Sequence, residues 1–338
     1  MADNYTIVVP MAGYGSRMRP HTWSKPKPLI RLAGGTVLDY VINQFQTLPR
    51  FGQARFVFIL SPHQEEQVIP YLKERFPDME FHIVVQEEMR GQSAALYQAR
   101  DLLTGPFLMA FSDTIIEPDL SALDDEPFDS VAWVKAVEDP RRFGVAETDS
   151  DGRVMRLIEK PSTMENNLVV VGFYYFKHGS KLMKAIEMQM DQDISLNGEY
   201  FIADAINLLL KDGSSMRAQP VSVWLDAGKP DALLATNRYL LDHGHGNDES
   251  FQAGKGSQMT APVFIHPEAK VSDSRVGPHV SIGPGVSIAG ANISNSIIDE
   301  GSHITGSTLT SSLVGRNARV NGVTGTLNIG DNAIVDCG

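Results

Sequence analysis

Residues 276–288 read Val-Gly-Pro-His-Val-Ser-Ile-Gly-Pro-Gly-Val-Ser-Ile, with aliphatic side chains returning among Gly, Pro and Ser. The same spacing, five to six residues from one aliphatic position to the next, continues on both sides of this stretch. Such a hexapeptide repeat is typical of a left-handed parallel β-helix, where one small apolar side chain per strand faces a narrow core. The repeated positions are Ile265, Val271, Val276, Ile282, Ile288, Ile293, Ile298 and Ile304.

No Phe, Tyr or Trp follows Phe264, which suits a core too narrow for aromatic rings. A disordered Gly/Ser tail would also lack aromatic residues, but it would not keep the regular aliphatic spacing. We therefore expect residues 259–338 to form the β-helix. The segment before it, residues 244–258, is rich in Gly, His, Asp and Ser and is expected to be a linker.

Upstream of the linker, residues 1–243 alternate short apolar runs with segments of helical spacing. Alternation of this kind favours an α/β domain, with a mainly parallel, Rossmann-like sheet covered by helices on both faces. One departure is a hairpin expected over residues 144–159, which turns at Asp151-Gly152. The expected strands are 6–9, 56–60, 81–85, 107–111, 131–137, 169–176 and 217–224; the expected helices are 37–48, 63–76 with a kink or break near Pro70, 92–103, 200–210 and 231–242.

The composition narrows the class of protein. The 338 residues include 42% hydrophobic residues, ample for a packed core, and carry a net charge of −12. A broad basic face for nucleic acid is not expected, although a local pocket can still bind a small anion. A signal peptide is not expected, no apolar run is long enough for a membrane span, and the single cysteine is Cys337. We expect a cytoplasmic protein in a reducing compartment that contacts no membrane.

A glycine-rich loop follows the first expected strand. Gly13 and Gly15 would let backbone N–H groups approach a phosphate, although a plain structural turn would use the same glycines. The dinucleotide fingerprint is excluded because Met18 stands where its third glycine belongs, and no Gly-Lys-Ser/Thr ends the loop as in a P-loop. Arg17 and Lys27 lie in the same loop and suit a polyphosphate. Three prolines stiffen it, namely Pro20, Pro26 and Pro28.

The loop also carries a family resemblance. Residues 13–29, Gly-Tyr-Gly-Ser-Arg-Met-Arg-Pro-His-Thr-Trp-Ser-Lys-Pro-Lys-Pro-Leu, resemble the signature loop of sugar-1-phosphate nucleotidyltransferases. This family includes glucose-1-phosphate thymidylyltransferases and UTP–glucose-1-phosphate uridylyltransferases, and the resemblance extends over the first 240 residues or so through further motifs in the same order. It implies that Arg17 and Lys27 contact the triphosphate. The residues implied to line the nucleotide here are Ala12, Gly13, Gly15 and Ser16.

Two aspartates are candidate Mg²⁺ ligands. Asp113 ends an apolar strand, at the edge where open α/β sheets bind ligands, and Asp226 follows another apparent strand. Either one alone would more often be a helix cap or a turn residue. Beside a phosphate loop they suit magnesium, which takes carboxylate and phosphate oxygens, and the family resemblance implies the same role. Ser112 and Lys229 depart from the family pattern, which has Gly before the first aspartate and commonly Thr after the second.

Base recognition is expected from Gln86, because a carboxamide can both donate to and accept from uracil or thymine. The resemblance implies this role for a glutamine five residues before a glycine, here Gly91, and implies that Gly91 and Gln92 line the nucleotide. A solvated Gln86 is the alternative. Sugar recognition is implied by similar motifs at residues 139–144, 159–161, 171–172 and 197–204. The sugar-binding candidates are Gly144, Glu159, Lys160, Val171 and Glu199, with Lys160 at the sugar phosphate; turn and cap roles are the alternatives for Gly144 and Glu199.

These observations predict an enzyme that uses Mg²⁺ to transfer a nucleotidyl group from dTTP or UTP to a hexose 1-phosphate, with glucose 1-phosphate as the default sugar. Its partners would be the nucleoside triphosphate, the sugar 1-phosphate and further copies of itself, since the β-helix is expected to mediate self-association or support the first domain. Two other functions stay open: an acetyltransferase in the β-helix, for which some eighty residues leave little room, and a non-catalytic sugar-nucleotide sensor.

Overall fold

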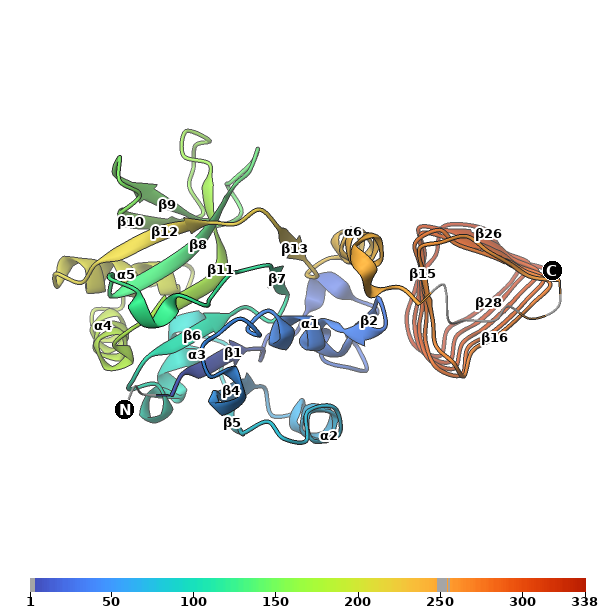
Figure 1. The fold of residues 1–338 in the computed structure, drawn as a ribbon, viewed down its shortest axis with the longest axis horizontal. Helices are drawn as coiled ribbons and strands as arrows, with labels where there is room; N and C mark the ends of the chain where they lie inside the picture. Colours follow the sequence, from blue (N-terminus) through green and yellow to red (C-terminus); the bar gives the residue numbers. More distant parts are fainter. Residues whose placement is uncertain (1–3, 248–253, 255) are drawn as a thin grey trace. The chain divides into compact units, whose positions relative to one another are not determined.

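The computed structural model describes residues 4–247, 254 and 256–338 (Figure 1). The chain divides into two compact units, each built from two separate segments. The first unit comprises Met1–Gly13 and Val41–Trp224, and the second comprises Tyr14–Tyr40 and Leu225–Gly338. These units group residues that lie close together in space, so they do not test boundaries along the chain. The domain boundaries 1–243, 244–258 and 259–338 therefore stay a prediction. Most of the predicted linker lies outside the described residues.

The first unit contains a nine-stranded sheet with the order β10-β9-β11-β6-β1-β4-β5, while β8 pairs with β11 and β12. Its centre is parallel, since β1 pairs in the same direction with both β4 and β6. β11 runs antiparallel to β6, β8 and β9, so the sheet is mixed around its parallel centre. The nine strands are β1 Thr6–Pro10, β4 Arg55–Leu60, β5 Phe81–Val85, β6 Phe107–Ala110, β8 Ser130–Ala136, β9 Gly144–Thr148, β10 Val154–Glu159, β11 Leu168–Phe176 and β12 Met216–Pro220. Two further strands, β7 Thr114–Ile116 and β13 Trp224–Asp226, lie outside this sheet.

Helices pack on this sheet through buried aliphatic side chains, among them Leu96, Leu182 and Ile206. Figure 1 shows α4 and α5 side by side against the sheet. The helices of the described chain, counting both units, are α1 Val37–Asn43, α2 Glu65–Arg75, α3 Gln92–Gln98, α4 Gly179–Asp191, α5 Ile202–Lys211 and α6 Pro230–Leu240. Short helical turns are η1 Ser16–Met18, η2 Lys27–Leu29, η3 Phe51–Gln53, η4 Arg100–Leu102, η5 Leu123–Asp125 and η6 Leu241–His245.

The predicted α/β fold is therefore confirmed, with differences in detail. The expected hairpin over 144–159 is β9 and β10, which pair antiparallel. α2 does not break at Pro70, because Val68 and Leu72 on either side of it are both fully buried and hold the helix in place. The strand expected over 217–224 is two strands, with β12 ending at Pro220. α4 was not predicted.

The second unit contains the predicted parallel β-helix. Three five-stranded sheets, all parallel, stack rung upon rung, as the coil in Figure 1 shows. The repeated aliphatic side chains fill the core; Ile282, Ile298 and Val314, for instance, occupy equivalent places on successive rungs. The sheets are β14 Gln258–Met259, β17 Arg275–Val276, β20 Asn292–Ser294, β23 Thr308–Thr310, β26 Thr324–Gly325; β15 Val263–Ile265, β18 Val280–Ile282, β21 Ile297–Ile298, β24 Leu313–Val314, β27 Asn328–Ile329; and β16 Lys270–Ser272, β19 Ser287–Ala289, β22 His303–Thr305, β25 Arg319–Asn321, β28 Ile334–Asp336.

Buried serines explain how the corners of the β-helix tolerate polar backbone in a small core. The Ser296 hydroxyl donates to the Ser294 carbonyl and accepts from the Ser312 N–H of the next rung, at 2.7 and 3.0 Å. Ser307, two corners further on, repeats the arrangement, donating to the Thr305 carbonyl and accepting from the Val323 N–H. Each such hydroxyl satisfies backbone groups that would otherwise be buried without partners. The repeat thus encodes both the apolar core and the hydrogen bonds at its corners.

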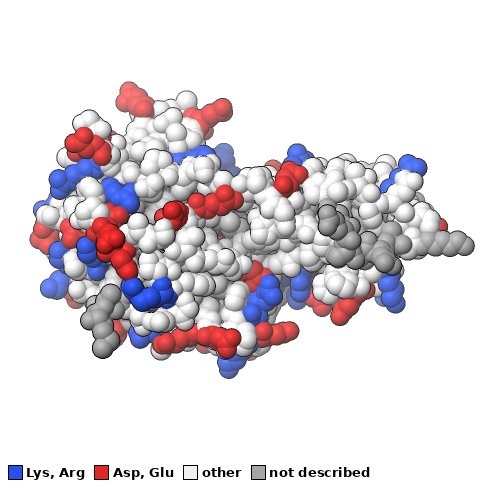
Figure 2. Space-filling view, in the orientation of Figure 1, with Lys and Arg blue, Asp and Glu red and all other residues white. Residues whose placement is uncertain are grey.

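On the surface, acidic side chains are interspersed with basic ones on the face shown in Figure 2. Among the described residues, none of the helices combines the length and the apolar character that crossing a bilayer would require.

Candidate active site

From Tyr14 onward the glycine-rich loop belongs to the second unit, where it closes on itself. Gly15 adopts a left-handed conformation with φ of +59°, and its carbonyl accepts hydrogen bonds from the Thr22 hydroxyl at 2.9 Å and the Met18 N–H at 2.9 Å. A Cβ atom on Gly15 would lie 3.1 Å from the Cβ of Lys27, so the two ends of the loop touch. Met18 is fully buried and anchors the turn.

The closed loop determines where the two predicted cationic side chains, Arg17 and Lys27, lie. Ser16 and Arg17 begin the turn η1 and are exposed, while Lys27 begins η2 and is half-buried. Gly15 permits the sharp turn because a larger residue would be strained in the left-handed conformation and would crowd the side chains of Lys27 and Thr22. The structure therefore gathers Gly15, Arg17 and Lys27 on one compact loop.

In the first unit, three of the predicted positions follow neighbouring parallel strands. Gly13 comes shortly after β1, Gln86 directly after β5, and Asp113 after β6. Because β6, β1, β4 and β5 are parallel neighbours, these positions share the carboxyl edge of the sheet, where open α/β sheets bind ligands. Ala12 is buried, and the open space beside Gly13 would accept a Cβ atom without contact.

The candidate base-reading residues adjoin the start of α5. Gln86 is buried at 5% exposure, its backbone N–H donates to the Leu60 carbonyl at 2.7 Å, and its carboxamide makes no hydrogen bond to another described residue. Gly91 has φ of +94°, and a Cβ there would lie 2.5 Å from the Tyr200 carbonyl oxygen. The Gln92 side chain accepts from the Ile202 N–H at 3.4 Å. The backbone around Gly91 thus packs so closely on Tyr200 that only glycine fits.

The candidate sugar-binding residues gather around Glu159. Gly144 pairs with Glu159 across the β9–β10 hairpin, and a Cβ on Gly144 would lie 3.1 Å from a Glu159 carboxylate oxygen. Lys160 follows with φ of +48°, and its ammonium lies 4.4 Å from the centre of the Phe201 ring. Burial raises the pKa of Glu159; Lys160 lowers it, while the carboxylates of Asp204 and Glu199 raise it further. The hairpin and the start of α5 therefore place one ammonium among several carboxylates.

Two residues of this cluster escaped sequence reasoning. Asp204 lies in the first turn of α5, and burial raises its pKa. Phe201, which carries the Lys160 ammonium on its ring, is buried just ahead of that helix. Both fall in the 197–204 motif, of which only Glu199 was singled out; Glu199 itself is exposed in a turn closed by hydrogen bonds with Leu196. The helical spacing of the apolar residues after Phe201 indicates a helix start, and it could have identified Asp204 in the first turn as a further candidate.

Val171 lies within β11 and is buried at 2% exposure, so its side chain belongs to the packing of the strand. Its neighbour Gly172 accepts a hydrogen bond from the Phe111 N–H at 2.9 Å. Any contact between Val171 and a sugar would therefore be made by the Val171 backbone.

Replacing Glu159 with glutamine is expected to separate stability from activity. A carboxyl group whose pKa is raised by folding binds its proton more tightly in the folded state, so its contribution becomes unfavourable as the pH rises above the ordinary value of 4.5. Glu159→Gln removes this cost, so its melting temperature at about pH 7.5 should equal or exceed that of the wild type, and the difference should vanish near pH 4.

If Glu159 binds a sugar, as the sequence predicts, turnover of a sugar phosphate by Glu159→Gln should nevertheless fall about tenfold or more, because a hydrogen bond to a charged group would be lost. Thermal melts across this pH range and initial rates at varied sugar phosphate measure both effects. Glu147→Gln, which alters a half-buried carboxylate paired with Arg156 on the same hairpin, is the control. A lower melting temperature for Glu159→Gln at neutral pH would show that the carboxylate stabilises the fold instead.

The two candidate metal ligands belong to different units. Asp113 is half-buried in the first unit. Asp226 is half-buried in the second; its carboxylate accepts from the Gly228 N–H at 2.6 Å, and its carbonyl accepts from Thr236 of α6 at 2.9 Å. Their convergence on one ion therefore stays a prediction. Within the described part of the chain, no three His, Cys, Asp or Glu side chains gather as a metal-binding group.

Comparison with known proteins identifies the family. A family model described as nucleotidyl transferase matches residues 7–243, and one described as the GMPPB C-terminal domain matches residues 259–335. The low-salt glycan biosynthesis nucleotidyltransferase Agl11 of Haloferax volcanii is 30% identical over 318 residues, which cover 85% of each chain.

The bifunctional protein GlmU of Methanocaldococcus jannaschii is 31% identical over 235 residues, or 70% of this chain and 54% of the relative. The match thus spans about half the length of GlmU. A structure of UDP-glucose pyrophosphorylase complexed with UDP-glucose superposes with a TM-score of 0.60 at 17% identity, covering 71% of this chain and all of the other, which supports the fold alone. Because the first family model spans the greater part of the sequence, the chain belongs to the nucleotidyl transferase family.

Proposed function

We propose that this protein transfers a nucleotidyl group from a pyrimidine nucleoside triphosphate to a hexose 1-phosphate, yielding a nucleotide sugar and pyrophosphate. The observation that carries the proposal is the closed loop between Gly15 and Lys27, which presents Arg17 on a rigid turn. Cations fixed on a loop rich in backbone donors suit a triphosphate, whose charge must be compensated during transfer. Membership of the nucleotidyl transferase family supports the same reaction class.

The reaction needs no nucleophile from the protein. An oxygen of the sugar phosphate attacks the α-phosphorus of the triphosphate and forms a new P–O bond, while the bond from that phosphorus to the bridging oxygen breaks and pyrophosphate leaves. Arg17 and Lys27 would stabilise charge on the triphosphate, and Lys160 would hold the sugar phosphate beside Glu159. Catalysis would then rest on alignment and charge compensation.

Magnesium fits the chemistry of the proposed donors. Asp113 and Asp226 are half-buried carboxylates, and Mg²⁺ typically takes one or two carboxylates together with substrate phosphates and water. When bound, the ion would neutralise charge on the phosphates and help to orient them.

The choice of base and sugar is the finer part of the proposal. The carboxamide of Gln86 supports a base that offers both a donor and an acceptor, as uracil and thymine do. These bases differ by one methyl group, worth only about 1–3 kcal/mol in a pocket, so both dTTP and UTP are proposed donors. Glucose 1-phosphate is the proposed acceptor by family resemblance. We also propose that the protein is cytoplasmic and forms a homo-oligomer.

Pyrophosphate release across a panel of nucleotides and sugar 1-phosphates tests the proposal. We expect release only with Mg²⁺, a pyrimidine triphosphate and a hexose 1-phosphate all present. Tight binding of a nucleotide sugar without any pyrophosphate exchange would instead favour the sensor function. Consumption of acetyl-CoA with amino sugar phosphates would favour acetyl transfer by the β-helix.

A further inference from the structure

Lys25 lies in the phosphate loop between Arg17 and Lys27, yet it takes no part in the mechanism above. Its side chain is 4% exposed and forms an ion pair with Asp299, and its ammonium also lies 4.0 Å from Asp331. Both carboxylates are almost fully buried as well. Burying a charged group without a partner is costly, so these three groups depend on one another.

The two carboxylates come from the β-helix. Asp299 follows β21 and Asp331 follows β27, two strands of the same sheet separated by β24. Gly315 on the rung between them is equivalent to Asp299 and to Gly330, and Asp331 is the residue after Gly330. A Cβ on Gly315 would lie 2.5 Å from the Asp331 nitrogen. Lys25 therefore reaches two carboxylates on the same side of the coil.

Neighbouring residues of the loop strengthen this attachment. The Ser24 hydroxyl donates to Asp331 at 2.6 Å, and His21 hydrogen-bonds Asn328 at 2.7 Å. Burial alone would raise the pKa of Asp331, but the hydrogen bond from Ser24, the charge of Lys25 and hydrogen bonds from Arg316 hold it below its usual range. The carboxylate is thus kept ionised for the loop.

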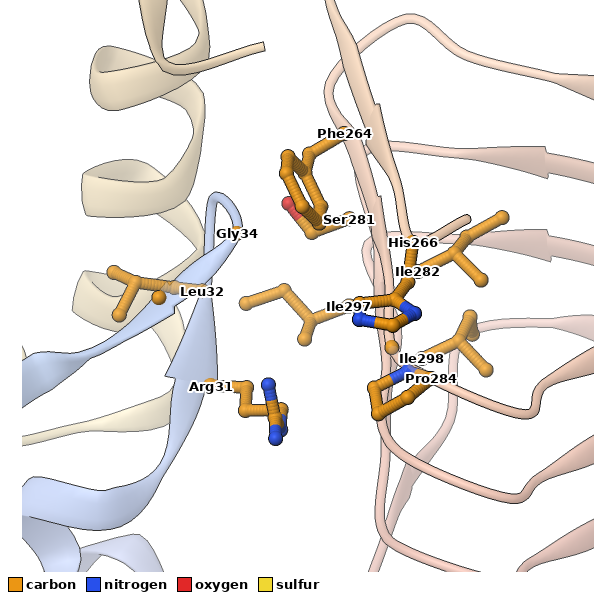
Figure 3. A pocket seen from close by; sticks show the side chains of 12 residues that line it. Arg31, Leu32, Gly34, Phe264, His266, Ser281, Ile282, Pro284, Ile297 and Ile298 are labelled. Carbon is orange, nitrogen blue, oxygen red and sulfur yellow. The ribbon is translucent and has the colours of Figure 1, made fainter. Parts of the chain in front are cut away.

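The hairpin that follows the loop, β2 Arg31–Leu32 and β3 Gly35–Thr36, contacts the β-helix too. The Ala33 N–H donates to Ser281 at 3.1 Å, and a Cβ on Gly34 would lie 2.4 Å from the Phe264 ring. Figure 3 shows Gly34 at the tip of this hairpin facing Phe264, and the Ile297 side chain pointing from the β-helix toward the hairpin. The cavity left between them is about 20 Å³, which is room for a single water molecule.

We propose that the β-helix is a positioning element for nucleotidyl transfer, and that Lys25, held by Asp299 and Asp331, fixes the loop carrying Arg17 and Lys27. The loop is closed at Gly15 by Thr22 and tied to the β-helix at His21, Ser24 and Lys25, so its shape depends on those rungs. Charged groups that compensate a triphosphate act well only when they are held in place beforehand. This inference rests on the proposed function.

Lys25→Met in the full chain tests it, with two readouts. Hydrogen exchange of peptides within residues 14–32 should accelerate tenfold or more, while exchange in the β-helix core stays unchanged. The kcat/KM for pyrophosphate release should fall at least tenfold, and Lys25→Arg should recover part of both. The control is Asp242→Asn, which removes a 2.8 Å contact with His279 elsewhere in the same unit and should alter neither readout.

Combining the variant with Arg17→Ala separates positioning from general damage. If Lys25 acts through the loop, Lys25→Met should cost less than about threefold in the Arg17→Ala background, because effects of residues that act as a unit are not additive. A merely destabilising substitution would cost the same in both backgrounds. Should Lys25→Met fail to fold, the double variant Lys25→Gln, Asp299→Asn replaces it, because it removes both charges of the ion pair. The same changes in hydrogen exchange and in kcat/KM are expected for it.

Wild-type kinetics in Lys25→Met, or unchanged exchange over residues 14–32, would overturn the proposal, as would faster exchange without a kinetic effect. Absence of pyrophosphate release from the wild-type protein would count against the proposed function instead. In that event the exchange data alone still decide whether Lys25 holds the loop to the β-helix.

Discussion

Arg17→Ala is expected to lower kcat/KM for pyrophosphate release by about 10²–10³-fold, the usual cost of losing a fixed group that stabilises transition-state charge. Arg17 is exposed on η1, while the buried anchor of that turn is Met18. Removing the guanidinium therefore takes nothing from the core, and the melting temperature should shift by only about 2 °C or less, as for ordinary surface substitutions. Initial rates and thermal melts of both proteins measure the two quantities.

The matched control is Arg19→Ala, which removes an equal charge from an exposed residue of the same loop. A loss specific to Arg17 supports direct contact with the triphosphate, whereas equal losses would indicate that only the overall charge of the loop matters. Near wild-type rates for Arg17→Ala would remove the proposed mechanism. Asp113→Asn provides a second arm, because loss of the carboxylate should likewise reduce turnover by orders of magnitude without lowering stability.

Local patterns predicted much of this fold. The β-helix was predictable because each rung repeats one local rule, an aliphatic residue inward and small residues at the corners, as Val276 and Ile282 illustrate. Strands such as β4 and β5 were equally plain as short apolar runs. α4 was missed although Leu182, Met183 and Ile186 are buried at helical spacing, since polar residues and methionines interrupt the pattern.

What the sequence could not supply was proximity between distant residues. The phosphate motif predicts the chemistry of Arg17 and Lys27, but nothing local indicates that Lys25 pairs with Asp299, 274 positions away. The compact unit that contains the β-helix also contains residues 14–40, and no local pattern in that stretch indicates this grouping. Pairings of this kind depend on the tertiary fold, so a motif alone does not reveal them.

Gly172→Ala is expected to cost about 2–5 kcal/mol in free energy of unfolding, the sum of a strained left-handed backbone and overpacking of the core. Gly172 has φ of +81° where the register of β11 against β8 shifts, and a Cβ there would lie 2.2 Å from the Phe111 ring. Phe111 also donates its N–H to Gly172 and stands two residues before Asp113, so turnover should fall as well.

Gly152→Ala isolates the steric part of that cost, because Gly152 has nearly the same φ, +79°, and nothing within 4 Å of a Cβ. It should lose only the backbone contribution of about 1–2 kcal/mol. Urea unfolding followed by circular dichroism at helical wavelengths compares the stability of the two variants. The helical signal reports on the first unit, which contains both glycines and the helices α2, α3, α4 and α5. If both variants lose the same stability, the Phe111 ring gives way freely, and the close approach of β11 does not hold the strand end before Asp113 in place. A larger loss for Gly172→Ala, accompanied by lower turnover, means that this contact links the packing of the sheet to the candidate metal ligand.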